Sequence, residues 1–150
     1  MFIKEIDLFT GMGMEVIDEI FQISAVESYS DGYILFKQGD PAHNFYLLEE
    51  GEIKLTIGEE GRLGFVMSPG DAFGWSSLVD RDVYTATAEC KLPSKLIKIE
   101  TDKLDKIFEK YPASGLIFFK RLARVMGERL INTYDTTLSA YKGGEQPSYG

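Results

Sequence analysis

The sequence has few of the residues that bind metals or form disulfides. Its 150 residues include one cysteine, Cys90, and one histidine, His43. A single cysteine cannot form an internal disulfide, and neither a Cys-x-x-Cys pair nor a set of several histidines is present to bind zinc or an iron–sulfur cluster. We therefore expect no metal site, with Cys90 buried as a small apolar residue and His43 exposed in a loop.

Positive charge and long apolar runs are also scarce. The chain has 16 Lys and Arg against 24 Asp and Glu, which gives a formal net charge of −8 at pH 7. Direct DNA binding is not expected, because Lys and Arg contacts to phosphates supply most non-specific affinity for nucleic acids. No run approaches the roughly 18 uncharged residues of a membrane span, and residues 1–5 do not resemble a signal peptide. These absences predict a cytoplasmic protein without a membrane partner.

Catalytic motifs are missing as well. Ser76 and Ser77 lie in no Gly-x-Ser-x-Gly motif and have no neighbouring base, and the chain contains no Walker-type phosphate loop. We therefore expect that the protein is not an enzyme.

The central region has the pattern of an antiparallel β structure. With 44% hydrophobic residues, the chain has enough apolar material for the core of one domain. Between Ala25 and Glu100, short β-rich runs that mostly alternate apolar with polar residues are separated by turns about every ten residues. This spacing leaves no room for crossover helices, so it predicts an antiparallel sandwich or barrel. The turn segments are Ser30–Gly32, Gln38–Pro41, Glu50–Gly51, Gly58–Gly61 and Ser68–Gly70.

Helical patterns flank this region. Residues 14–23 carry one apolar face, which predicts a short amphipathic helix. Thr101 is the expected N-cap of a second helix that stops at Tyr111-Pro112. A longer helix is predicted from about 112 to 142, so that residues 1–142 form one domain and 143–150 a flexible tail.

The long helix carries a heptad pattern of apolar and small residues, with a second stripe at Leu122 and Val125. The seam either packs wholly onto the β core or pairs with the same helix of a second subunit. The apolar arc formed by the two stripes is too broad for one narrow contact, which favours a homodimer. The seam positions are Leu116, Phe119, Ala123, Met126, Leu130, Thr133, Thr137 and Ala140. Four basic residues are expected on the solvated face of this helix: Lys120, Arg121, Arg124 and Arg129.

Residues 70–78, followed by 84–88, have the pattern of a ligand-binding loop. A glycine turn that opens onto small hydroxyl residues can present backbone N–H groups to an anion. Gly74 permits close approach of the backbone, while Ser76, Ser77 and Thr85 add hydroxyl groups.

Taken together, these features resemble the cyclic nucleotide-binding domain family, which includes the catabolite activator protein-like (Crp/Fnr-type) regulators and the regulatory subunits of protein kinase A. The resemblance covers nearly the whole chain. It implies a mainly β fold, an eight-stranded antiparallel double-stranded β-helix jelly roll with flanking helices. It also implies a regulatory small-molecule sensor, here without a DNA-binding domain after the long helix. The matching segments are Ile6–Phe9, Phe36–Ala42, Phe45–Leu55 and the turn residues Gly32, Gly39, Gly51 and Gly70.

The resemblance also implies roles for individual loop residues. In this family the loop contains Phe-Gly-Glu, whose glutamate binds the ribose hydroxyl, and Arg-Thr-Ala or Arg-Ser-Ala, whose arginine pairs with the cyclic phosphate. Here Trp75 stands at the glutamate position and Tyr84 at the arginine position. Charged hydrogen bonds contribute roughly 1.5–3 kcal/mol each, so the loss of both would weaken cyclic nucleotide binding by about 10² to 10⁴.

The predicted ligand site combines this loop with one position on the long helix, where the resemblance implies a contact to adenine. Trp75 either stacks on a planar ligand or plugs the pocket. Arg81 either replaces the missing cation or faces solvent. The predicted site residues are Phe73, Gly74, Trp75, Ser76, Ser77, Leu78, Arg81, Tyr84, Thr85, Ala86 and Thr133.

Two functions remain open at this stage. In the first, the protein senses a cyclic nucleotide or another small anionic effector, needs no further cofactor, and passes the signal to a second subunit or a partner protein. In the second, Trp75 and Tyr84 close the pocket, and the protein is a ligand-free dimeric interaction module.

Overall fold

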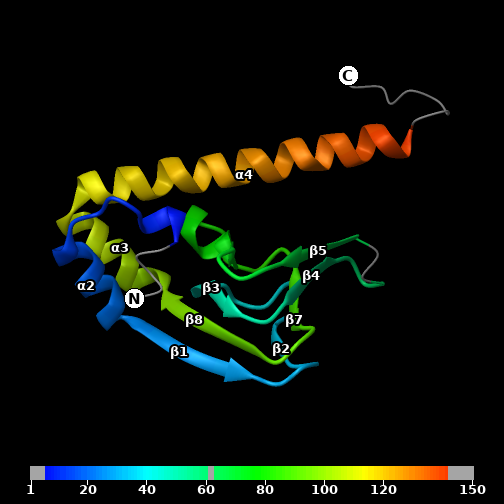
Figure 1. Cartoon of the computed structure of the whole chain (residues 1–150), viewed down its shortest axis with the longest axis horizontal. Coiled ribbons are helices and arrows are strands. Elements are labelled where there is room, and N and C mark those ends of the chain that lie inside the picture. Colours follow the sequence, from blue (N-terminus) through cyan, green and yellow to red (C-terminus); the bar gives the residue numbers. More distant parts are fainter. Residues whose placement is uncertain (1–5, 61–62, 142–150) are drawn as a thin grey trace.

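Two four-stranded antiparallel sheets lie beneath one long helix, with shorter helices at one end of the sheets, in the computed structural model, which describes residues 6–60 and 63–141 (Figure 1). The expected mainly β fold with flanking helices is confirmed. The first sheet has the order β1 (Ser24–Tyr29), β8 (Ser94–Glu100), β3 (Asn44–Glu50), β6 (Ala72–Phe73). The second has the order β2 (Ile34–Phe36), β7 (Thr87–Cys90), β4 (Ile53–Ile57), β5 (Leu63–Met67).

Strand β3 contributes to two separate cores because its side chains alternate between the two faces of the sheet. Phe45 and Leu47 belong to a cluster formed with the helices, while Tyr46 and Leu48 belong to a cluster between the two sheets. All four side chains are buried, so β3 is covered on both faces. Cys90 is fully buried in the second cluster, as expected.

The turn at Gly51 shows why the sequence needs glycine there. Its φ is 99°, a conformation that side chains other than glycine's rarely adopt. A Cβ at this position would lie 2.7 Å from the carbonyl oxygen of Pro93 and 2.7 Å from the Cα of Ser94. The turn can therefore pack against the start of β8 only without a side chain.

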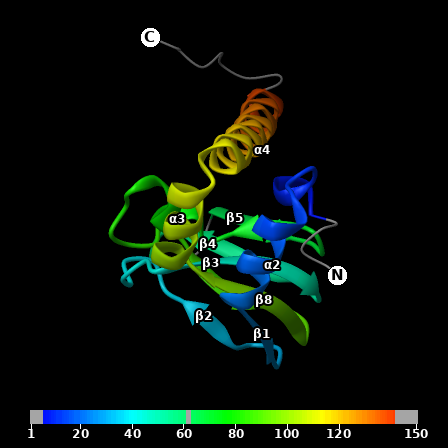
Figure 2. The same ribbon diagram turned by 90° about the vertical axis from the view of Figure 1, so that its left-hand side faces the viewer.

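The helices before and after the strand region in sequence contact one another in space. α2 and α3 lie at the same end of the sheets (Figure 2). α3 stops before Pro112, which occupies the first turn of α4, as the sequence predicted. The helical elements are η1 (Asp7–Phe9), α2 (Met14–Gln22), η2 (Trp75–Val79), α3 (Thr101–Lys110) and α4 (Pro112–Ala140).

One predicted helix cap is wrong. The N-cap of α3 is Glu100, without a side-chain capping bond, and Thr101 is the first helical residue. Thr101 is buried, and its hydroxyl lies 2.6 Å from the hydroxyl of Ser77. A tertiary hydrogen bond has therefore replaced the local cap that the sequence indicated.

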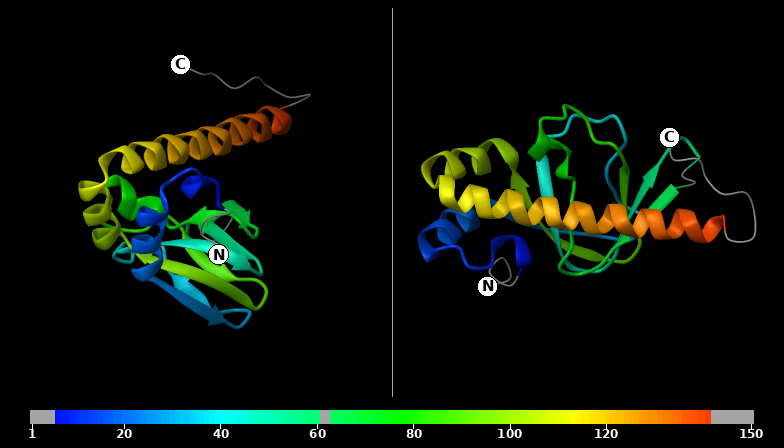
Figure 3. Two further views of the ribbon diagram at one scale, coloured as in Figure 1. Left: turned by 60° about the vertical axis from the view of Figure 1, so that its left-hand side comes forward. Right: turned by 90° about the horizontal axis from the view of Figure 1, so that it is seen from above.

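Helix α4 begins beside α3 and continues across the roll above β4 and β5 (Figures 1 and 3). Its fully buried residues are Gly115, Phe118 and Leu122. Phe118 packs against Phe9 and Phe108, with ring centroids 5.4 and 5.1 Å away. The predicted heptad seam lies beside this buried face, so it does not pack wholly onto the core: Leu116 is 62% exposed and Leu130 is 51% exposed.

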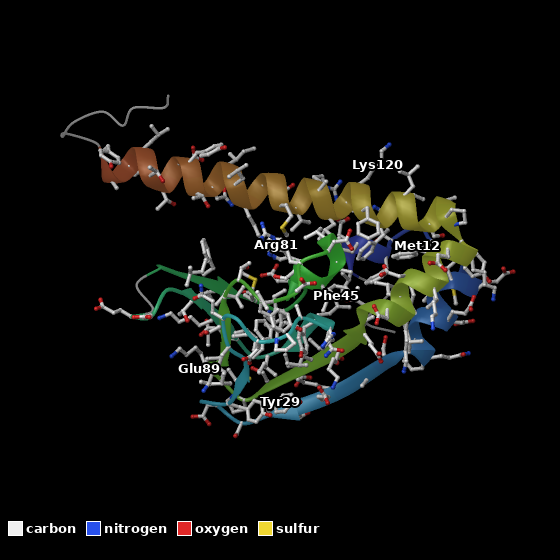
Figure 4. All side chains as sticks on the ribbon, turned by 180° about the vertical axis from the view of Figure 1, so that it is seen from behind. Met12, Tyr29, Phe45, Arg81, Glu89 and Lys120 are labelled. Atoms are coloured by element: carbon white, nitrogen blue, oxygen red, sulfur yellow. The ribbon has the colours of Figure 1, made fainter. Side chains whose placement is uncertain are left out.

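The basic residues of α4 do not share one solvated face. Lys120 projects away from the sheets (Figure 4), and exposed Arg124 pairs with Asp7. Arg121 donates to backbone carbonyls of the segment around η1. Arg129 is partly buried and donates to the carbonyl oxygen of Ala72 at 2.7 Å. The prediction is therefore wrong for Arg129, because the helix is rotated to bury Phe118 and Leu122.

The expectations of no membrane span and no metal site can be compared only with the described residues. No helix within residues 6–60 and 63–141 is long and apolar enough to cross a membrane. The same residues contain no group of three or more His, Cys, Asp or Glu side chains arranged to bind a metal ion. His43 is exposed in a loop, as expected. The predicted tail, 143–150, lies outside the described residues.

Candidate ligand-binding site

The predicted binding loop begins with a left-handed glycine. Gly74 follows β6 with φ 74° and ψ 32° and precedes η2. A Cβ on Gly74 would lie 3.0 Å from Cδ2 of Tyr46 and 3.4 Å from the carbonyl oxygen of Asn44. The absence of a side chain lets the loop lie directly against β3.

The two serines of the loop are directed to structural contacts. Ser76 is 3% exposed, and its carbonyl oxygen accepts a hydrogen bond from the backbone N–H of Arg81 at 3.1 Å. Ser77 shares its hydroxyl with Thr101. Neither serine lines the cavity that lies between the loop and α4. This part of the loop therefore contributes to folding contacts, not to the cavity wall.

Tyr84, which stands at the family's arginine position, belongs to the core between the sheets. Its side chain is buried, and its ring stacks on Phe36 with centroids 3.7 Å apart. Its hydroxyl donates to the carbonyl oxygen of Asn44 at 2.7 Å and accepts from the Asn44 N–H at 3.2 Å. Burial raises the pKa of the Tyr84 hydroxyl, although the hydrogen bonds to the Asn44 backbone partly oppose this shift. This position therefore holds a neutral phenol whose oxygen is both donor and acceptor in hydrogen bonds with the Asn44 backbone.

A cavity of about 970 Å³ lies between the roll and α4. Its walls come from β4, β5, η2, the segment before β7, and α4. Four of the predicted site residues line it: Trp75, Thr85, Ala86 and Thr133. The other predicted site residues lie outside its lining: Phe73, Gly74, Ser76, Ser77, Leu78, Arg81 and Tyr84. The structure thus brings together Trp75 of the first loop segment, Thr85 and Ala86 of the second, and the face of α4 that contains Thr133.

Arg129 is the charged residue in the described lining of this cavity, and the sequence analysis did not include it in the site. Burial lowers the pKa of its guanidinium, an effect that the nearby charge of Asp71 opposes. Thr133 donates its hydroxyl hydrogen bond to the carbonyl oxygen of Arg129, one helical turn earlier. The sequence did contain a signal for Arg129. This residue lies four positions before Thr133, a predicted site residue, and positions i and i+4 share a helix face.

Arg81, the cation that the sequence suggested as a substitute, is exposed on the loop after η2 (Figure 4). It does not line the cavity. The side chain of Trp75, by contrast, is partly buried, packs against the core cluster of the helices and also forms cavity wall. A single tryptophan therefore lies between the core and the cavity.

The comparisons with known proteins agree with this architecture. The profile of the cyclic nucleotide-binding domain matches residues 26–111, and the chain therefore belongs to this family. A cAMP-dependent protein kinase regulatory subunit from Hypocrea atroviridis is 30% identical over 126 residues, which cover 84% of this chain and 26% of that protein. The chain spans about a fifth to a quarter of the length of the first curated relatives that it matches.

Solved structures show the same fold. A cyclic nucleotide-binding domain from Methylobacillus flagellatus KT matches with a TM-score of 0.80 and 18% identity, over 99% of this chain and 83% of that one. Catabolite activator protein from Thermus thermophilus matches with a TM-score of 0.70 and 23% identity, over 87% of this chain and 62% of that one. The jelly roll and long terminal helix are thus shared with Crp/Fnr-type regulators.

Proposed function

We propose that this domain is a non-enzymatic, cytoplasmic regulatory sensor whose small-molecule effector occupies the cavity between the roll and α4. The observation that carries the proposal is that one cavity is lined both by the binding loop, through Trp75 and Thr85, and by α4, through Arg129 and Thr133. Its volume of about 970 Å³ is in the range of small-molecule sites. An occupant would therefore contact the roll and the helix at once.

Helix α4 is the output element of this proposal. Its first half is held by the buried side chains of Phe118 and Leu122. Beyond Arg129, the side-chain hydrogen bonds of α4 within the described residues go to the helix's own carbonyl oxygens. An effector that binds one position of this second half more tightly than another would shift the helix.

A second copy of the chain is the proposed partner that binds α4 and responds to that movement. Large apolar side chains of α4 that lie outside the cavity lining are exposed, and an apolar helix face can pair with an identical helix. These residues include Leu116, Ile131 and Leu138. Sedimentation velocity should detect a dimer that the Leu138→Lys substitution weakens. If the wild-type chain stays monomeric at about 100 μM, a partner protein and not a second copy would respond to the movement of α4.

Cyclic nucleotides are the first effectors to test. With Trp75 and Tyr84 in place of the family's glutamate and arginine, we expect cAMP and cGMP to bind weakly. Calorimetric titration measures this directly, and a screen of metabolites can use fluorescence, since Trp75 is the only tryptophan. Micromolar binding of cAMP would contradict the expected weak affinity and leave the sensor role intact.

A ligand-free interaction module is the second candidate. The observation that favours it is the burial of the Tyr84 phenol, which fills the interior at the family's phosphate-contacting position. A metabolite screen that never changes the Trp75 fluorescence or the calorimetric heat, together with a stable dimer, would favour this candidate over the sensor.

A further inference from the structure

The chemistry of the cavity wall restricts what can bind there. Most of the wall is apolar, including Phe65, Trp75, Met126 and Leu130, and the described lining contains no acidic residue. Burying polar groups against such a wall without hydrogen-bond partners is costly. The cavity therefore favours a ligand whose body is largely apolar.

Three of the four threonine hydroxyls in the described lining add little donor capacity. Thr133, Thr136 and Thr137 each donate their hydroxyl hydrogen to a carbonyl oxygen one turn earlier in α4. The other neutral side-chain donors in the described lining are the Thr85 hydroxyl, the Asn132 amide and the indole N–H of the single tryptophan. A ligand rich in hydroxyl and carbonyl acceptors would therefore find few donors on this wall.

Arg129 is the charged donor in the described lining. Its guanidinium has five N–H donors in a planar fork, and within the described residues it makes one hydrogen bond, to Ala72. It is partly buried, so an anion paired with it would face less competition from water than at the surface. Carboxylates match the fork geometry of arginine, and such pairs are frequently bidentate.

Resting on the proposed function, we propose that the cavity binds an apolar organic monocarboxylate, whose carboxylate pairs with Arg129 and whose body lies against the apolar wall. A single anionic group fits a single cation, and the chain's net charge of −8 disfavours more highly charged ligands. The polar sugar and base of a cyclic nucleotide fit this wall less well, because it offers few free donors.

The test compares acids with neutral compounds of the same shape. Calorimetry would measure 4-phenylbutyrate against 4-phenylbutanamide, octanoate against octanamide, and phenyl phosphate as a dianion. The variants are Arg129→Gln, which removes the cavity cation, and Arg124→Gln, a matched control whose side chain pairs with Asp7 outside the cavity. A third variant, Ala123→Trp, fills the cavity from an exposed helical position.

We expect at least one acid to bind wild-type protein about tenfold or more tightly than its amide, since a charge-assisted hydrogen bond has about this effect. Arg129→Gln should remove that preference and Arg124→Gln should preserve it. Ala123→Trp should abolish binding of acid and amide alike. The comparison of acid with amide in the wild type needs no variant, so it holds even if Arg129→Gln folds poorly.

The opposing results separate this inference from the proposed function. If acids and amides bind equally, or if phenyl phosphate binds most tightly, the carboxylate pairing is wrong while the sensor cavity stands. If no acid binds below about 1 mM but cAMP does, the ligand class is likewise wrong. If neither these acids, the cyclic nucleotides nor the metabolite screen gives a signal, the inference and the proposed function fall together.

Discussion

The guanidinium of Arg129 donates a hydrogen bond to the carbonyl oxygen of Ala72 at 2.7 Å and so connects α4 with β6, two residues before Gly74. The two partners are 57 positions apart in the chain. The same arginine lines the cavity. A ligand anion at Arg129 would therefore act on the contact that joins the terminal helix to the binding loop.

Loss of this contact should loosen the second half of α4. For Arg129→Ala we expect faster amide hydrogen exchange from about residue 126 onward, because the side-chain link to the roll is removed. The free energy of unfolding should fall by about 1.5–3 kcal/mol, the usual net value of a hydrogen bond to a charged group. Hydrogen exchange detected by mass spectrometry measures the first effect.

The control for that experiment is Arg124→Ala, which removes an exposed ion pair with Asp7. Exposed pairs contribute about 0–1 kcal/mol, and no change is expected in the last turns of α4. Equal exchange in both variants would show that the Ala72 contact does not hold the helix.

Tyr84→Phe should destabilise the fold by about 1–3 kcal/mol, since it leaves backbone groups of Asn44 buried without their partner. Urea unfolding measures the change. Tyr134→Phe is the matched control, because Tyr134 is 49% exposed on α4. A Tyr84→Phe variant as stable as the control would mean that water replaces the phenol at Asn44.

Gly51→Ala and Gly58→Ala form a pair that separates steric overlap from backbone strain. The two glycines have φ values of 99° and 91°, but only Gly51 has neighbouring atoms where a Cβ would lie. We expect Gly58→Ala to cost about 1 kcal/mol through strain alone and Gly51→Ala clearly more. Similar midpoints of thermal unfolding for the two variants would contradict the overlap with Pro93 and Ser94.

Stability should decline in alkaline solution through tyrosines that are buried or partly buried. Burial, followed by the neighbouring Glu27 carboxylate, raises the pKa of Tyr29 to about 12, and burial also raises the pKa values of Tyr46 and Tyr84. A phenol whose pKa is higher in the folded state stabilises the fold fully below its unfolded value of about 10. That stabilisation is lost as the pH rises from about 10 towards 12.

Urea unfolding at intervals from pH 8 to 11.5 tests this dependence. The free energy of unfolding should be level up to about pH 9.5 and then fall, and the decline should be shallower in Tyr29→Phe. Absorbance at 295 nm reports the tyrosines that titrate in the folded protein. A single transition near pH 10 for all tyrosines would contradict the raised values.

Much of the fold follows from local patterns in the sequence. The alternation in β4 and the turn at Gly51 predict strands without knowledge of their partners, since each depends on adjacent residues. The break at Pro112 likewise follows from the missing N–H of proline. The cap at Thr101 failed because its hydroxyl bonds to Ser77, which lies far away in sequence.

The candidate site was only partly predictable. The loop contributed Trp75 and Thr85 to the cavity, as the sequence suggested, whereas Arg129 was placed on the solvated face. The heptad analysis chose a seam beside the buried one, because apolar residues occur on both stripes of α4. No local feature of the sequence shows which of the two stripes is buried.

By itself the sequence determined the antiparallel β region, the position of the loop between β6 and β7 and the length of the long helix, because alternation, turns and helix breaks are local properties. Only the tertiary structure decided which cation meets the cavity. Packing of Phe118 against Phe9 and Phe108 sets the rotation of α4 about its axis. That rotation brings Arg129 to Ala72, while Arg81 remains exposed on its loop.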